Sequence, residues 1–154
     1  MAAEDSSPGE DFVRLCRQGD LEAVKAAGGF GAQVPEEFGG AGLNSTQYGR
    51  LTEVIGANDL GLGVFLTGHQ GIGFKGILLV GTEDQKNKYL ADLAAGTRMA
   101  AFALTEPGSG SDASSISTRA ELSPDGSHYV MNGSKIWITG GSTYHTIHQL
   151  FHGT

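Results

Sequence analysis

The spacing of apolar residues changes near Met99, and this change restricts the folds that the chain can adopt. Before Met99, apolar residues recur at helical intervals, for example over residues 48–55 and 89–93. After Met99, short apolar runs alternate with Gly, Pro, Asn and Ser, which is typical of strands and tight turns. Helices that precede antiparallel strands predict an α+β fold. Three or four strands are too few for a closed barrel, so we expect only the beginning of a β domain.

Polar residues mark the ends of the predicted helices. Asn44 with Gln47, and Thr82 with Gln85, have the spacing of a capping box, so we expect one helix to begin at each pair. A shorter amphipathic helix is predicted over residues 12–27, where two glycines follow it. Residues 1–11 are polar and acidic, and we interpret them as a solvated, disordered tail.

Glycine is unusually frequent, with 25 of 154 residues, against about 7% in average proteins. Six of these glycines lie in the apolar segment 60–80, where each costs a helix about 1 kcal/mol relative to alanine. We therefore expect close helix packing there, or two short helices in place of one. His69 lies in the same segment, and we interpret it as a hydrogen-bonded core residue rather than a ligand.

The second half of the chain contains the signals of β structure. Residues 100–104 form a short apolar run that predicts a buried strand, and residues 117–122 and 128–131 predict a hairpin around the turn SPDG. Asn132 and Gly133 predict a further two-residue turn, and KIWIT at residues 135–139 predicts another strand.

Charge, cysteine content and hydropathy exclude several classes of function. The net charge of -7 argues against nucleic acid as the main partner. A single cysteine, Cys16, cannot form an internal disulfide, and no apolar run reaches the roughly 18–20 residues of a membrane helix. The acidic start resembles neither a secretory signal nor a transit peptide. His145, His148 and His152 could share a helical face and bind zinc, but we favour an unstructured tail because nearby Thr and Gly disfavour a helix.

Two stretches carry candidate ligand-binding chemistry. After the apolar run, FALTEPGSGSD at residues 102–112 offers the hydroxyls of Thr105, Ser109 and Ser111 beside backbone exposed by glycines. Such a surface suits phosphate oxygens or the polar rim of a planar heterocycle, although an ordinary loop has the same composition. In KIWIT, Trp137 could stack beside an aromatic cofactor while Thr139 bonds its edge, or it could simply pack in the core.

These two stretches, in this order and about twenty residues apart, resemble the paired flavin-binding signature of acyl-CoA dehydrogenases. The resemblance continues upstream in QVPEEFGGAGLNSTQYGRLTEVIG and HQGIGFKGILLVGTEDQKNKYLADLAAG, and it is closest to the very-long-chain branch. It implies an amino-terminal helical domain at residues 12–97, the start of the middle β domain at residues 98–141, and an unaligned tail at residues 142–154.

The resemblance also implies a cofactor, FAD, and the residues that bind it. Thr105 would bond the pyrimidine side of the flavin, Trp137 would flank the ring, and the Thr139 hydroxyl would approach N5, the hydride acceptor. Ser111 would lie near the pyrophosphate and also near the acyl-CoA substrate. The complete set that the resemblance assigns to the cofactor is Phe102, Leu104, Thr105, Gly110, Ser111, Trp137, Ile138 and Thr139.

The implied activity is α,β-dehydrogenation of long-chain fatty acyl-CoA thioesters in fatty acid β-oxidation. Electrons would pass to an electron-transfer flavoprotein, and the resemblance implies a mitochondrial homo-oligomer at full length. The family's catalytic base lies on a carboxy-terminal helical domain, and none of Glu36, Glu37 and Glu106 lies in a matching segment. We therefore expect an incomplete copy with little turnover of its own.

Three alternatives stay open at the level of sequence. The chain could be a non-catalytic remnant that binds a partner or flavin, or an unrelated helix-rich binding module. It could also belong to the acyl-CoA oxidases, which share the flavin chemistry but pass electrons to oxygen.

Overall fold

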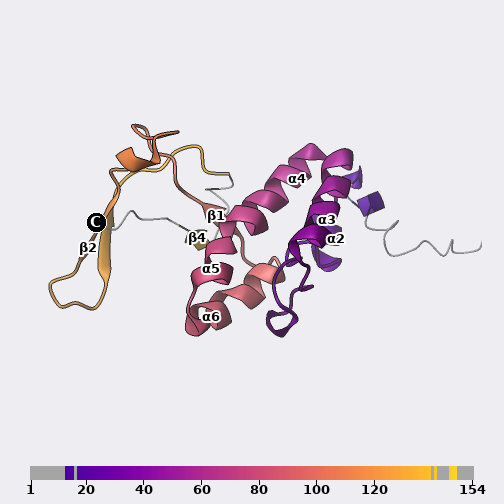
Figure 1. Cartoon of the computed structure of the whole chain (residues 1–154), viewed down its shortest axis with the longest axis horizontal. Helices are drawn as coiled ribbons and strands as arrows, with labels where there is room; N and C mark the ends of the chain where they lie inside the picture. Colours follow the sequence, from indigo (N-terminus) through magenta and orange to yellow (C-terminus); the bar gives the residue numbers. More distant parts are fainter. Residues whose placement is uncertain (1–12, 16, 140, 142–145, 149–154) are drawn as a thin grey trace, which may run out of the picture.

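The computed structural model describes residues 13–15, 17–139, 141 and 146–148, and it has the α+β order that the sequence predicts. The helical elements are α2 (Leu21–Ala26), η1 (Glu36–Phe38), α3 (Ser45–Asn58), α4 (Leu60–Leu66), η2 (Thr67–Gly73), α5 (Lys75–Val80), α6 (Glu83–Ala94) and η3 (Ala113–Ser115). The strands are β1 (Ala100–Phe102), β2 (Arg119–Leu122), β3 (Tyr129–Asn132) and β4 (Thr146–His148). Figure 1 shows helices α2 to α6 together at one side, a hairpin projecting at the other, and strands β1 and β4 between them.

Both predicted capping boxes are present. The Asn44 side chain accepts hydrogen bonds from the backbone of α3, and the Asn44 backbone N–H donates to the Gln47 side chain. Thr82 and Gln85 make the same reciprocal bonds at α6. The single helix predicted over residues 12–27 is wrong, because the chain turns at Gly19 with φ 63° and Asp20 then caps a separate helix, α2. A left-handed backbone and an N-cap side chain both interrupt a helix.

The glycine-rich segment forms two short α-helices, α4 and α5, joined by the π-helical turn η2. Close packing is also present, because a Cβ on Gly73 would lie 2.6 Å from the carbonyl oxygen of Gly68 and 3.0 Å from that of Ala100. Only glycine lets η2 approach β1 this closely.

The apolar core consists of two clusters, and His69 lies between them. One cluster is built around Phe30 and Leu66, and the other around Phe74 and Leu93. The His69 ring lies 5.3 Å from the ring of Phe30 and 5.0 Å from the ring of Phe74, between centroids. The imidazole is fully buried. Because it contacts a ring of each cluster, it joins the two clusters into one core.

Hydrogen bonds fix the protonation state of His69. Its Nδ1 accepts a bond from the backbone N–H of Ala100 at 3.1 Å, so the proton lies on Nε2, which donates to the Leu93 carbonyl at 2.9 Å. Burial lowers the pKa of His69 to about 4, because water no longer stabilises its charged form. The interpretation of His69 as a satisfied core residue is confirmed.

The neighbouring Gln70 is also buried and bonds a different segment of the chain. Its Oε1 accepts from the backbone N–H of Ala32 at 3.1 Å, and its Nε2 donates to the carbonyl of Gly29 at 2.9 Å. A regular α-helix turns adjacent side chains apart by about 100°, whereas here two consecutive residues of η2 are both buried.

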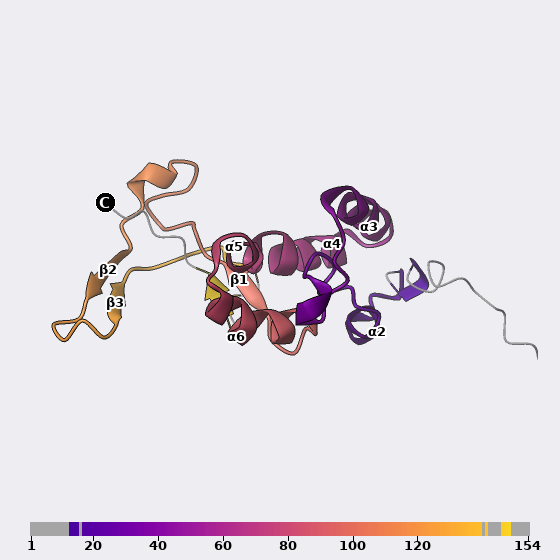
Figure 2. The same ribbon diagram turned by 60° about the horizontal axis from the view of Figure 1, so that its bottom comes forward.

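The predicted hairpin is confirmed, and the rest of the β region differs from prediction. Strands β2 and β3 pair antiparallel around a turn in which Gly126 has φ 69°, and they project away from the helices in Figure 2. The strand predicted over residues 135–139 is absent, and so is the turn at Asn132 and Gly133. Gly133 instead lies against Thr118, whose Oγ1 would be 2.2 Å from a Cβ at this position.

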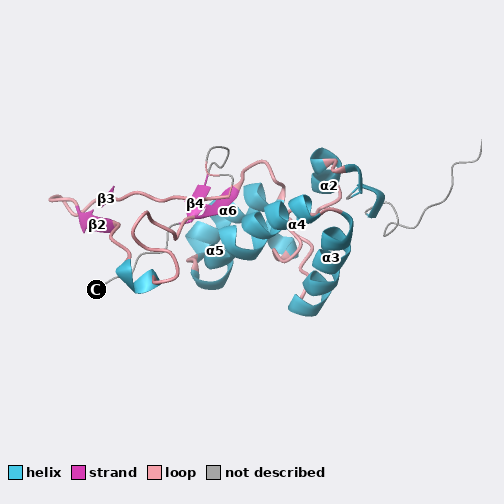
Figure 3. Cartoon of the chain, turned by 90° about the horizontal axis from the view of Figure 1, so that it is seen from above, coloured by secondary structure: helices cyan, strands magenta, loops and turns pink. Residues whose placement is uncertain are grey.

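A parallel pair that the sequence did not predict completes the β structure. Ala101 of β1 aligns with Ile147 of β4, and Figure 3 shows both strands beside the helices and apart from the hairpin. The tail expected to lack structure therefore contains a short strand. The predicted tail at residues 1–11 and two residues of the zinc hypothesis, His145 and His152, lie outside the described residues.

Within the described part of the chain, no helix is both long and apolar enough to span a bilayer. The same part contains no group of three or more His, Cys, Asp or Glu side chains suited to hold a metal ion.

We predict that Gln70→Ala lowers the free energy of unfolding by about 2–6 kcal/mol, because two buried backbone groups lose their partners at about 1–3 kcal/mol each. Urea unfolding followed by circular dichroism measures this loss. Gln85→Ala is the matched control, because Gln85 makes its hydrogen bonds at an exposed helix end, and it should cost about 1 kcal/mol or less. Equal losses for the two variants would contradict this role of Gln70.

We further predict that stability falls as pH decreases from about 6.5, the ordinary pKa of histidine, toward 5. In this window the unfolded chain takes up a proton at residue 69, and the folded chain, with a pKa of about 4, does not. Above pH 6.5 the contribution is constant. Urea titrations at several pH values measure the slope, which should persist in His128→Gln, since His128 is exposed. A flat profile in both proteins would refute the prediction.

Candidate functional site

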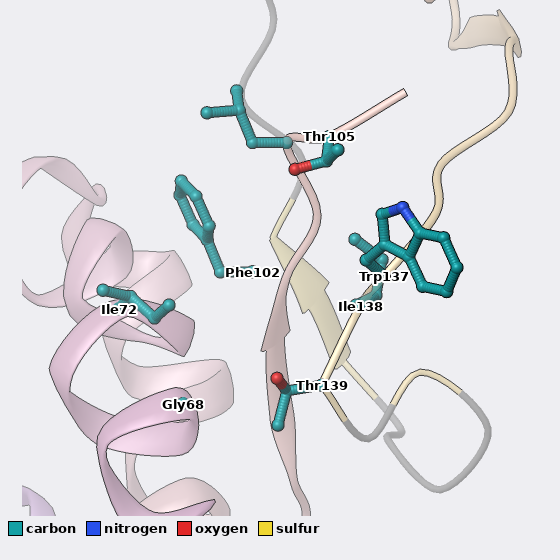
Figure 4. A pocket seen from close by; sticks show the side chains of 8 residues that line it. Gly68, Ile72, Phe102, Thr105, Trp137, Ile138 and Thr139 are labelled. Atoms are coloured by element: carbon teal, nitrogen blue, oxygen red, sulfur yellow. The ribbon is translucent and has the colours of Figure 1, made fainter. Parts of the chain in front are cut away.

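A cavity of about 190 Å³ lies between η2 and the segments that follow β1 and β3. Figure 4 shows Phe102 between the helical segment that carries Ile72 and the part of the chain that carries Thr105. The lining residues are Gly68, Ile72, Phe102, Leu104, Thr105, Trp137, Ile138 and Thr139. Six of the eight residues that the sequence assigned to a cofactor thus meet in one cavity, although they come from two segments separated by the hairpin.

The other two assigned residues, Gly110 and Ser111, do not line this cavity and are exposed. Their loop is organised by its own hydrogen bonds. Ser109 is buried and its hydroxyl donates to the Asp112 carbonyl at 2.6 Å, so it is not the ligand donor that its sequence position suggested. The Asp112 carboxylate accepts from Ser114 and Ser115, which lowers its pKa.

Sequence reasoning missed Gly68 and Ile72, which form the helical side of the cavity. A Cβ on Gly68 would lie 3.4 Å from Cγ2 of Thr139, so a side chain larger than alanine there would enter the cavity. The glycine-rich composition of the segment was visible in the sequence. The π turn η2 determines which residues of this segment line the cavity. The sequence contains no signal for that turn.

Trp137 is the one described non-glycine residue with a left-handed backbone, at φ 59°, and its side chain is 87% exposed. The core-packing interpretation of this residue is therefore wrong. A left-handed conformation costs an ordinary residue about 1–2 kcal/mol, and such strain is concentrated at functional sites. The same conformation also ends any regular strand through residues 135–139.

Hydrogen bonds hold the two lining segments against each other. The backbone N–H of Ile136 donates to the Thr105 carbonyl at 3.0 Å, and the Lys135 ammonium donates to the Leu104 carbonyl at 2.8 Å. Lys135 also forms an ion pair with Glu106, with 2.9 Å between Nζ and Oε1. Hydrogen bonds from Thr118, Lys135 and Ser117 hold the pKa of the Glu106 carboxyl well below its usual range.

A second, more apolar cavity of about 370 Å³ adjoins the first, and the two share Gly68, Ile72 and Thr139. Residues of α3 and α4, together with Thr67 of η2, complete its lining. Neither of these two cavities is lined by a carboxylate. Glu36 and Glu37 are exposed in the first turn of η1 and are therefore solvated residues at a helix start.

Two family models match this chain: "Acyl-CoA dehydrogenase, N-terminal domain" over residues 10–97 and "Acyl-CoA dehydrogenase, middle domain" over residues 101–153. The chain therefore belongs to the acyl-CoA dehydrogenase family. This confirms the family that the two motifs indicated, and it agrees with the helical region followed by β structure.

Three of the proteins that this chain resembles carry dehydrogenase or flavoprotein names. The very long-chain specific acyl-CoA dehydrogenase of human mitochondria is 55% identical over 85% of this chain, which spans 20% of that relative. An acyl-CoA dehydrogenase from Bacillus anthracis, solved in complex with FAD, is 38% identical with a TM-score of 0.73 over 90% of this chain and 28% of its own. An electron transferring flavoprotein from Acidaminococcus fermentans is 32% identical with a TM-score of 0.78 over 96% and 44% of the two chains.

The lining fits part of a flavin. Thr105 and Thr139 offer hydroxyls for ring heteroatoms, Trp137 offers an aromatic face, and Phe102 and Ile138 offer apolar contacts. The cavity of about 190 Å³ is smaller than the roughly 300–1,000 Å³ typical of complete small-molecule sites. The cavity formed by the described residues is therefore too small to enclose a complete flavin.

We predict that Trp137→Gly changes the free energy of unfolding by no more than about 1 kcal/mol, because glycine relieves left-handed strain but adds entropy to the unfolded chain. A core tryptophan would instead cost about 3–5 kcal/mol when truncated. Urea unfolding followed by far-ultraviolet circular dichroism distinguishes these outcomes. Trp137→Ala keeps the strain and should be less stable than the glycine variant; the reverse order would contradict the prediction.

Proposed function

We propose that the chain contributes one wall of an FAD site in an enzyme that dehydrogenates long-chain fatty acyl-CoA thioesters between the α and β carbons. One observation carries this proposal: two sequence segments, separated by a hairpin, bring two threonine hydroxyls and an exposed, strained tryptophan to a single cavity. The relative solved with FAD and the very-long-chain relative support the cofactor and the substrate class.

Different residues of the cavity would contact different parts of the cofactor. Thr105 and Thr139 would hydrogen-bond the ring edge, and Trp137 would flank the ring. When bound, the flavin supplies the hydride acceptor, and the protein supplies orientation and a dry surface. Ser111, exposed on the loop beyond Thr105, would meet the pyrophosphate and the acyl-CoA. We assign Gly110 to the same contact.

The partners and location that we propose follow the relatives. An electron-transfer flavoprotein would accept the electrons, in keeping with the family and with the name of the Acidaminococcus protein. A mitochondrial location is supported by the name of the human relative. We also propose a homo-oligomer. This chain spans about one fifth of the human relative's length. Neither cavity contains a proton-abstracting base, and we propose that another part of the whole enzyme supplies it.

We predict that the chain, incubated with FAD and then desalted, retains a visible flavin absorption band. Gly68→Leu should lose the band, because its side chain would fill the cavity beside Thr139. Absorption spectra and the ratio of flavin to protein measure retention.

The matched control is Gly49→Leu, since a Cβ on Gly49, which is exposed on α3, would meet nothing within 4 Å. It should retain as much flavin as the parent. A colourless parent protein would count against the proposal for this chain. Retention by Gly68→Leu would place the flavin elsewhere.

A further inference from the structure

The ion pair between Glu106 and Lys135 lies behind the cavity wall rather than in it. Neither residue lines the cavity, and their side chains are only 2% and 7% exposed. Glu106 directly follows the lining residue Thr105, and Lys135 lies two residues before Trp137. The pair therefore connects the two segments where the first one leaves the cavity and the second one enters it.

Each partner is held by several further bonds. The Glu106 carboxylate accepts from the backbone N–H of Ser117 at 2.7 Å and of Thr118 at 3.0 Å, and from both of their hydroxyls. Lys135 donates to the Leu104 carbonyl as well as to Glu106. Three stretches of chain, around residues 104–106, 117–118 and 135, thus converge on one buried carboxylate.

Such a buried pair is poor evidence for stability alone, because desolvation of the two charges can exceed their attraction. It is effective at fixing a geometry, because any other arrangement leaves a buried charge without its partner. Here the fixed geometry is the spacing between Thr105 and the segment of Trp137 and Thr139, which line the same cavity.

We propose that Glu106 and Lys135 are positioning residues for the flavin: the pair sets the distance between the two lining segments and thereby the affinity and the environment of the ring. This inference rests on the proposed function of the cavity. It predicts that the loss of either charge changes flavin binding although neither side chain contacts the cofactor.

The test measures the dissociation constant for FAD by flavin fluorescence, and the ring environment by visible circular dichroism, in Glu106→Gln and Lys135→Met. We expect affinity to fall about ten- to hundredfold, as when supporting partners are removed at metal centres, with an altered visible spectrum. Lys135→Arg keeps the charge and should recover most of the affinity. The double variant Glu106→Gln with Lys135→Met leaves no unpaired charge, so its loss should be smaller than the sum of the single losses.

The matched control is Glu83→Gln with Lys86→Met, which removes an ion pair of the same 2.9 Å length from the surface of α6. It should bind FAD as the parent does. Far-ultraviolet circular dichroism confirms that each variant keeps its helices. If the parent binds FAD and the Glu106 and Lys135 variants bind it equally well with unchanged spectra, the positioning role is refuted while the flavin site stands.

A second readout keeps the two proposals distinguishable if the parent binds no FAD, which would overturn the flavin site in this chain. Hydrogen exchange of the Ile136 amide reports the spacing directly, because this N–H bonds the Thr105 carbonyl. Its exchange should accelerate at least about tenfold in Glu106→Gln, while the amide of Leu90, buried in α6, is unchanged. Unchanged exchange at Ile136 would refute the role of the ion pair.

Discussion

The adjacent buried residues His69 and Gln70 make the hydrogen bonds on which the arrangement of the described chain depends. Their four bonds reach backbone groups of Gly29, Ala32, Leu93 and Ala100, which lie in two regions, residues 29–32 and 93–100, each more than twenty residues away in sequence. Each of these backbone groups would be costly to bury without a partner. The π turn is the local geometry that buries both side chains, and it leaves Gly68 and Ile72 on the cavity. The seven residues of η2 therefore contribute both to the packed interior and to the cavity lining.

A second buried polar network, around Glu106, differs from the first in charge and in consequence. His69 and Gln70 are neutral and join elements that are already packed in an apolar core. Glu106 and Lys135 are charged and join segments that have little regular secondary structure, since residues 133–139 form no strand. In a low-dielectric interior, hydrogen bonds strengthen but an unpaired charge becomes very costly. The neutral network thus stabilises the packed helical core. The charged network holds the two lining segments in one arrangement, because any other arrangement would leave a buried charge unpaired.

Local chemistry explains why part of this structure could be predicted from the sequence. The capping boxes at Asn44 and Thr82 and the hairpin turn at Gly126 depend on residues within a few positions, so their patterns are sufficient. KIWIT has the composition of a strand, but Trp137 adopts φ 59° and Lys135 is drawn to Leu104 and Glu106. Gly133 has the signature of a tight turn, but it is needed for close contact with Thr118. In these cases distant residues override local preference. The sequence predicted the two motifs that line the cavity. It did not predict the helical side formed by Gly68 and Ile72, because no local pattern marks a π turn.

The helical part of the described chain and the β2–β3 hairpin differ in how much apolar surface they bury. From α2 to β1, apolar side chains from several helices enclose a core that His69 and Gln70 complete. The β2–β3 hairpin, in contrast, is a two-stranded sheet whose Leu122, Tyr129 and Met131 are exposed, and isolated hairpins of this kind are marginal in water. The lining segments lie on either side of this hairpin in sequence, so their alignment cannot be inherited from a rigid sheet. It has to come from direct bonds between the segments, and the bonds of Glu106, Lys135 and Ile136 supply it.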